Sequence, residues 1–236
     1  MANITRRSAL QSIAVAGTGL AVGAAGASAQ DGQMMAKPAA PGMKVPAYAP
    51  VVYKLDDLVG LNKDMLEQHY KLYAGYVTNT NKANTALSEM IAAGKTDSAD
   101  FAETRRRLGF EYNGMRLHEY YFGSMKSGGS PVDAKLKAAV EAVWGTWDAW
   151  MADFVRTGMM RGIGWSMLYQ DPMNGALSHH WISDHEYFHP AGFTPILVMD
   201  VWEHAYYLQF GAQGRKAYVD AFFKNVDWSV VGKRLK

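Results

Sequence analysis

The feature that most constrains the fold is a change of hydrophobic period in the middle of the chain. From Asn62 to Ala92, apolar and aromatic residues recur at steps of three and four, the period of one helix face. The stretch GKTDSAD breaks this pattern, with Gly94 as a stop and Asp97 or Ser98 as a cap. A second helical run then extends from Ala99 to Met125. The two runs together predict a helical hairpin.

A different pattern follows the boundary KSGGSP at residues 126–131. Two helical runs come first, at 132–144 and 146–158, and three short runs then have the composition of strands: GWSMLYQ, ALSHHWI and TPILVMD. The turn residues DPMNG between the first two favour an antiparallel hairpin, and helical patterning returns from Val201. We therefore expect an α+β fold. A helical hairpin domain at 51–130 precedes an α/β domain at 131–236 with a small three-stranded antiparallel sheet.

The N-terminal residues have the features of an export signal. TRRSALQ places two arginines before a small, weakly hydrophobic run that ends in an A-x-A cleavage site at 27–29. This predicts a twin-arginine-type signal peptide over 1–29 and a periplasmic or secreted protein. The alternative is a retained membrane anchor, but the run is too rich in Gly and Ala to form a strong membrane-spanning helix. Residues 30–50 hold four of the eight prolines and predict a tether, or an arm lying over the surface.

Charge and cysteine content exclude several classes of function. Arg6 and Arg7 account for the whole excess of 24 basic over 22 acidic residues, so the rest of the chain has no net charge. This argues against a nucleic-acid surface, and we expect no membrane association once the signal is removed. The chain has no cysteine, which excludes disulfides, thiolate nucleophiles and cysteine-held zinc or iron–sulfur sites. Any metal would have to be held by histidine and carboxylate.

One candidate metal site is His185-Glu-Tyr-Phe-His189, which fits the HExxH pattern of zinc peptidases. That mechanism needs both histidines on one helix, with Glu186 activating a zinc-bound water. Pro190 directly after the second histidine, and Pro195 beyond it, argue against a long helix here. The single Glu186-x-x-His189 pair also lacks the second copy that a di-iron carboxylate site requires.

The other candidate is the pair Asp200 and His204, which follows the apolar run TPILVM. At a strand end that leads into a helix, both side chains can face one point. His69 and His118 could supply further ligands, since each lies mid-helix among apolar residues, where an unpaired imidazole would be costly. Taken singly, these positions are more typical of a capping aspartate and of core histidines than of metal ligands.

Longer stretches around these residues resemble one family. PILVMDVWEHAYYLQFGAQGRKAYVDAFFKNVDW closely resembles the C-terminal signature of iron/manganese superoxide dismutases, whose hallmark D-x-W-E-H-A-Y-Y is complete here. LGFEYNGMRLHEYYFGSM is similar to the family's second helix, GIGWSMLY to its G-S-G-W strand start, and HYKLYAGYVTNTNKAN to its first helix. The resemblance covers about residues 50–236. It implies an enzyme that converts superoxide to O2 and hydrogen peroxide, with one Fe or Mn ion per subunit cycling between +2 and +3.

The resemblance also implies the residues of the site. Four match the family's metal ligands: His69, His118, Asp200 and His204. Three imidazoles and one carboxylate suit both oxidation states of iron or manganese. Tyr76 matches a gate tyrosine with a catalytic role. His185 stands where many members have a glutamine that bonds the solvent ligand, and archaeal-type members resemble this chain by having histidine there. Gly114, four residues before His118, agrees with this assignment. In members where that glutamine comes from this part of the second helix instead, its side chain would stand at the position of Gly114.

Further matches concern the walls and the assembly. Trp165 and Trp202 match aromatic walls of the pocket, although such aromatic residues are often simply core. Glu203 and Tyr207 match residues that reach across the family's homodimer interface, and a tetramer is also compatible. Arg215 matches an arginine of the substrate funnel, where it could attract the superoxide anion.

Three departures from the family leave an alternative open. His69 and Tyr76 are seven residues apart, where the family usually has eight. A histidine common in the funnel is Leu72 here, and a tryptophan usual four residues after the second ligand is Phe122. The alternative is a dismutase-like protein that binds metal with weak or no turnover.

Overall fold

The computed structural model describes residues 41–236, which belong to one compact unit. The predicted signal peptide and the first part of the predicted tether lie outside the described residues. Within 41–236, no helix has both the length and the apolar character that crossing a membrane requires.

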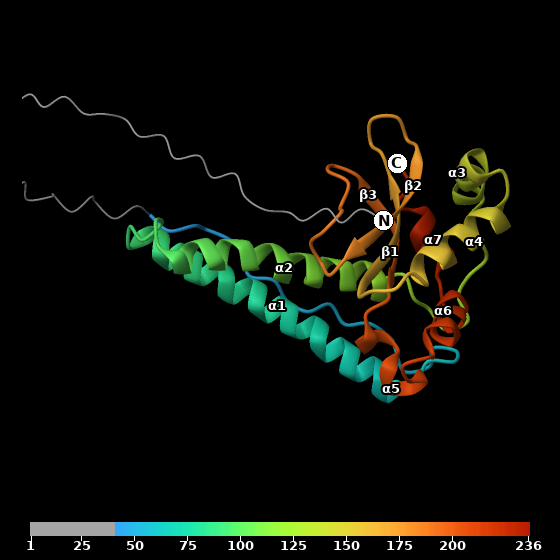
Figure 1. The fold of residues 1–236 in the computed structure, drawn as a ribbon, viewed down its shortest axis with the longest axis horizontal. Helices are drawn as coiled ribbons and strands as arrows, with labels where there is room; N and C mark the ends of the chain where they lie inside the picture. Colours follow the sequence, from blue (N-terminus) through green and yellow to red (C-terminus); the bar gives the residue numbers. More distant parts are fainter. Residues whose placement is uncertain (1–40) are drawn as a thin grey trace, which may run out of the picture. The chain divides into compact units, whose positions relative to one another are not determined.

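The first half is the expected helical hairpin. Helices α1 (Lys63–Ala92) and α2 (Ala99–Phe122) run side by side (Figure 1). The side chain of Asn62 caps α1 by accepting from the Met65 amide, and Ser98 caps α2 in the same way. Gly94 follows α1 with φ of +68°, a conformation that costs glycine little. Helix α2 ends three residues earlier than the helical run in the sequence.

The second half contains the expected three-stranded antiparallel sheet, and its strand order is β2-β1-β3. Its strands are β1 (Gly164–Gln170), β2 (Leu177–Ser183) and β3 (Thr194–Asp200). Two helices precede the sheet, α3 (Ala134–Trp144) and α4 (Trp147–Gly158). Four short helices follow it: η1 (Glu203–Ala205), α5 (Tyr207–Phe210), α6 (Arg215–Phe223) and α7 (Trp228–Gly232).

The central strand β1 is buried along its whole length, because both faces of the sheet are covered. Successive side chains of a strand point to opposite faces. Trp165 therefore faces α2, with its ring 5.0 Å from the ring of His118, while Ser166 faces α4 and donates to the Phe154 carbonyl. Because α1 packs on α2, the sheet and the helical hairpin meet on the Trp165 side.

A segment without regular structure lies along the hairpin before α1. The backbone N–H and C=O of Tyr48 bond the two ends of the Asn81 amide, at 2.8 and 2.9 Å. The amide of Val51 donates to the Tyr73 hydroxyl at 2.8 Å. The described part of the Pro-rich region is thus an arm fastened to α1.

Candidate metal centre

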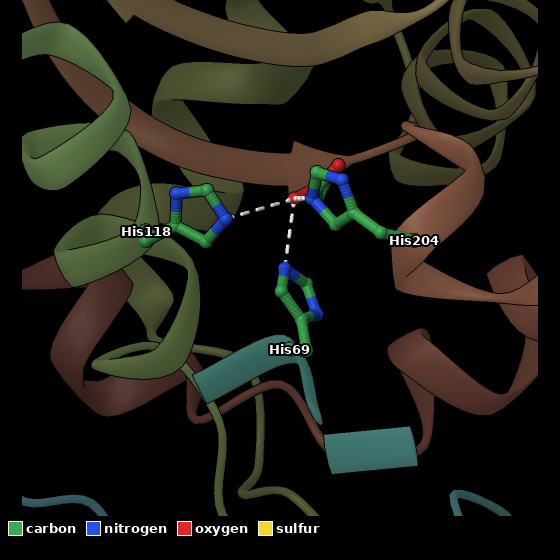
Figure 2. A group of neighbouring side chains, drawn as sticks. His69, His118 and His204 are labelled. Atoms are coloured by element: carbon green, nitrogen blue, oxygen red, sulfur yellow. Dashed lines mark hydrogen bonds and ion pairs between the residues drawn. The ribbon is translucent and has the colours of Figure 1, made fainter. Parts of the chain in front are cut away.

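Four side chains from four separate elements converge between the hairpin and the sheet. His69 comes from α1, His118 from α2, Asp200 from the last position of β3, and His204 from η1. Their candidate ligand atoms all lie within 4.8 Å of one another. Figure 2 shows the three imidazoles pointing toward one point.

One carboxylate oxygen is the centre of this group. Asp200 Oδ2 lies 3.0 Å from Nε2 of His69, 3.2 Å from Nε2 of His204 and 3.5 Å from Nε2 of His118. The side chains of His69, His118 and Asp200 are fully buried, whereas that of His204 is 19% exposed. Each imidazole thus directs its Nε2 atom at Asp200 Oδ2. Solvent reaches the group only on the side of His204.

The local structure explains how Asp200 is aimed. It pairs with Trp165 across the sheet, and its Oδ1 accepts from the Trp202 amide at 2.8 Å where the chain turns into η1. Its backbone carbonyl accepts from the Tyr218 hydroxyl at 2.7 Å. The strand, the turn and Tyr218 therefore leave Oδ2 free to face the histidines.

The contacts of His118 test whether these residues suit a metal ion. Its Nδ1 lies 2.6 Å from the Gly114 carbonyl, and a carbonyl oxygen can only accept, so Nδ1 carries the proton. The neutral ring then has a lone pair on Nε2, which is buried and has no hydrogen-bond partner among the described residues. This lone pair faces the Asp200 carboxylate. Two electron-rich atoms in a dry site need a cation between them, so the residues fit a metal ion.

The protonation states agree with this use. Burial lowers the pKa of His69 and lowers the pKa of His118 further, so both rings stay neutral at physiological pH. Burial acts to raise the pKa of Asp200, but His204 and His69 outweigh it and hold that pKa well below its usual range. Neutral imidazoles and an ionised carboxylate are the forms that bind metals.

His185 lies beside the cluster and links two aromatic side chains. The Trp165 indole N–H donates to His185 Nδ1 at 3.0 Å. Since an indole nitrogen only donates, neutral His185 carries its proton on Nε2 and donates it to the Tyr76 hydroxyl oxygen at 2.8 Å. Burial lowers the pKa of His185 to about 4, so the neutral form prevails. The Tyr76 hydroxyl hydrogen is then free to point elsewhere.

Other predicted residues pack around these rings. Trp202 is stacked against His204 with ring centroids 5.5 Å apart and lies 4.8 Å from His185, while Phe122 lies 4.9 Å from His69.

The residues expected at an interface or funnel lie nearer the surface. Glu203, the first residue of η1, and Tyr207, two residues after its end, are both exposed. The Arg215 guanidinium donates to the carbonyls of Met160 and Gly162, at 2.6 and 2.7 Å, which fixes the loop before β1. Its funnel role stays a prediction.

The HExxH residues do not assemble a zinc site. Residues 184–186 form a turn instead of a helix, and Tyr187 makes an isolated β-bridge to Ser183. Nε2 of His185 faces Tyr76, whereas Nε2 of His189 lies 3.0 Å from the His185 backbone carbonyl. The two imidazoles therefore address different partners, and the peptidase alternative finds no support.

The sequence interpretation missed two supporting tyrosines. The hydroxyl of Tyr218, which donates to Asp200, lies 3.0 Å from that of Tyr121, and both residues are fully buried. Because the Tyr218 hydrogen goes to the Asp200 carbonyl, Tyr121 donates to Tyr218. The sequence feature that could have identified them is a tyrosine on an otherwise apolar helix face, because a buried hydroxyl needs a hydrogen-bond partner.

Comparison with known proteins agrees with this geometry. Residues 132–234 match the family described as iron/manganese superoxide dismutases, C-terminal domain. A superoxide dismutase (Fe) of Cupriavidus metallidurans is 37% identical over 180 residues, covering 75% of this chain and 89% of that protein. A superoxide dismutase (Fe) of Aquifex pyrophilus is 32% identical over 78% of this chain and 88% of its own length. A superoxide dismutase (Mn) of Haloarcula marismortui is 30% identical over 78% and 90%.

Proposed function

The chain belongs to the iron/manganese superoxide dismutase family and converts superoxide to O2 and hydrogen peroxide, and we propose that it does so as an exported homodimer. We further propose that Tyr76 and His185 control proton transfer beside the metal. The observation that carries the reaction is the convergence of three Nε2 atoms on one Asp200 oxygen in a buried site. Iron or manganese, when bound there, supplies the electron exchange by cycling between +2 and +3.

The four converging side chains would hold the ion. Three neutral imidazoles and one carboxylate place a single negative charge next to it, which favours the +3 ion without excluding +2. The tautomer of His118 is set by the Gly114 carbonyl, and the direction of Asp200 is set by Tyr218 and the turn at Trp202. These bonds keep the donor atoms in place whether or not the charge at the centre changes.

Peroxide formation consumes protons, and the bonds of Tyr76 suit it for handling one. His185 donates to the Tyr76 oxygen, so the phenol hydrogen is left to donate into the centre. Trp165 keeps His185 in the tautomer that makes this possible. The order Trp165, His185, Tyr76 therefore gives a directed set of donors that ends beside the reacting species.

Replacing Tyr76 by Phe tests this role. We expect metal content and fold to be retained and turnover to fall by about 10-fold or more, the usual size of a lost proton donor or outer partner. Superoxide consumption by rapid mixing, together with metal analysis of the same sample, makes the measurement. Tyr112→Phe is a matched control, because Tyr112 is exposed and packs against the arm. Equal turnover in the Tyr76 and Tyr112 variants would remove Tyr76 from the mechanism.

A homodimer is supported by the surface beside His204. Tyr207 and Leu208, at the start of α5, are 57% and 60% exposed, and Glu203 in η1 is also exposed. His204 is the one member of the cluster that solvent reaches. A second copy over this surface would bury the apolar groups and close the site to bulk water.

Export is supported by the N-terminal sequence, with its paired arginines and its A-x-A site at 27–29. A chain without cysteine also has no thiol for extracellular oxidants to modify. Fractionation of producing cells, with mass spectrometry of the product, tests this. We expect the mature chain to begin at Gln30, outside the cytoplasm. A full-length chain in the cytoplasm, or one held in the membrane, would overturn the proposal.

A further inference from the structure

His189 has no part in the metal cluster, yet its two ring nitrogens are both engaged. Nε2 lies 3.0 Å from the backbone carbonyl of His185, and Nδ1 lies 2.8 Å from the hydroxyl of Tyr169. The carbonyl can only accept, so Nε2 carries the proton. Nδ1 of the neutral ring then accepts from Tyr169, whose hydroxyl is a good donor. The direction of every bond from Tyr169 to His185 is thereby fixed.

The segment that this ring supports is strained. Asp184 and Phe188 have φ of +53° and +76°, a conformation that residues with side chains seldom adopt. Strain of this kind persists only where the surroundings fix the backbone. His185 lies directly after the first of these two residues, so its peptide depends on contacts made from elsewhere in the fold.

Two donors from different elements hold that peptide. Asn113 of α2 donates its side-chain amide to the His185 carbonyl at 2.8 Å, from the hairpin side. His189 donates to the same oxygen and is itself bonded to Tyr169, a buried residue of the central strand β1. The carbonyl of His185 is therefore tied both to the hairpin and to the sheet.

The position of the His185 ring follows from this attachment. Its two nitrogens must meet the Trp165 indole and the Tyr76 hydroxyl at 3.0 and 2.8 Å at the same time. A ring that bridges two fixed partners tolerates little movement of its own backbone, since hydrogen bonds weaken quickly with distance and angle.

We propose that His189 is a positioning residue of the dismutase: by holding the His185 carbonyl to Tyr169 of the central strand, it places the His185 ring between Trp165 and Tyr76. The inference rests on the role proposed above for His185. It gives the second histidine of HEYFH a function that involves no zinc and no contact with substrate.

The test compares three variants of the metal-loaded enzyme. His189→Leu removes both bonds, His189→Gln keeps an N–H that can donate to the His185 carbonyl, and Tyr169→Phe removes only the hydroxyl. The matched control is His180→Leu, because His180 also packs against Tyr169, at 5.4 Å, but bonds Ser178 and not the His185 segment.

We expect His189→Leu to keep its metal and to lose about 10-fold in turnover, the usual effect of removing an outer partner. Tyr169→Phe should lose less, His189→Gln should recover most of the activity, and His180→Leu should match the parent. A crystal structure of the Leu variant should show the His185 ring displaced from Tyr76 or Trp165. If the Leu variant does not fold, the Gln and Phe variants decide, through the same crystal and turnover measurements.

Two results would overturn the inference: an undisplaced His185 ring with full turnover in His189→Leu, or equal losses in the Leu and Gln variants and the His180 control. His185→Leu separates this failure from that of the parent proposal. If His185→Leu keeps full turnover, the role of His185 itself is wrong. If it loses turnover while His189→Leu does not, only the positioning role of His189 fails.

Discussion

Gly114 shows how an absent side chain shapes the metal centre. A Cβ atom at this position would lie 2.7 Å from the nearest carbon of the Tyr76 ring and 2.9 Å from two others. Contacts this short force a shift, so the Tyr76 ring can rest against α2 only because residue 114 is glycine. The same residue supplies the carbonyl that fixes the tautomer of His118.

Gly114→Ala should therefore move Tyr76 away from His185. We expect turnover to fall about 10-fold with metal retained, since the displaced group is an outer partner. Overpacking should cost about 1–3 kcal/mol, set against about 1 kcal/mol gained by alanine in a helix. Superoxide consumption and urea unfolding measure the two effects.

Gly75→Ala is the matched control for this substitution. It lies next to Tyr76 on α1, and an added Cβ there meets nothing within 4 Å. This variant should keep full turnover and gain about 1 kcal/mol of stability. If Gly114→Ala behaves as Gly75→Ala does, the close fit of Tyr76 has no functional weight.

At the scale of elements, α1 resolves the seven-residue spacing between His69 and Tyr76. The helix is regular from Lys63 to Ala92, and seven residues make almost two full turns. Both side chains therefore face the centre, and His69 reaches Asp200 without any irregularity in the helix.

Strand β2 buries a histidine against the helices on the far side of the sheet from the centre. His179 lies 3.0 Å from Asp153 of α4 through Nδ1, and its Nε2 is buried with no partner among the described residues. Burial lowers the pKa of His179, because a protonated ring would bury an unpaired N–H group.

This burial predicts how stability depends on pH. The pKa of His179 is lower in the folded chain than the usual 6.5 of an unfolded chain. Between these two pKa values the unfolded state binds one more proton at residue 179 than the folded state does. The contribution of His179 to the free energy of unfolding is therefore constant above about pH 6.5 and declines as pH falls below it. One such group contributes at most about 1.4 kcal/mol per pH unit.

Urea unfolding at pH 7.5 and 5.5 measures this effect. His179→Gln should lose less stability between the two values than the parent does, because glutamine does not titrate. His180 and His189 also have a lowered pKa and remain in both proteins, so the difference between the two slopes isolates His179. Equal slopes would show that His179 is not linked to folding.

Over the whole molecule, the sequence predicts the elements better than their contacts. The strands GWSMLYQ and TPILVMD agree residue for residue with β1 and β3, because apolar runs bounded by turn residues are a local signal. His69 and Asp200 are 131 residues apart, and no spacing rule brings them together. Their meeting was expected from a family resemblance and not from periodicity.

The hydrogen bonds that support the site could not be predicted from the sequence, for a physical reason. The partners of Tyr218 and Asn113 are backbone carbonyls 18 and 72 residues away, and the partner of His189 is the backbone carbonyl four residues before it. Every residue carries a backbone carbonyl whatever its side chain, so the residue type does not show which carbonyl accepts a bond. Side chains that bond backbone are therefore assigned only when the fold is known.

The proposed homodimer makes a prediction at this scale. Tyr207→Asp places a charge on the exposed surface beside His204 and should give a monomer with lower turnover. Met173→Asp is the control, since Met173 is 89% exposed in the β1–β2 turn. Light scattering on a sizing column gives the mass of each form. A parent protein that is monomeric at micromolar concentration would contradict the dimer.

The central claim is that His69, His118, Asp200 and His204 hold one redox-active ion, and metal analysis of His118→Ala tests it most directly. The parent should contain about one iron or manganese ion per chain, and the variant almost none, because a missing ligand removes both affinity and charge balance. Superoxide consumption should vanish with the metal, while His180→Ala keeps both. A variant that still binds its metal and consumes superoxide at the parent's rate would contradict the account.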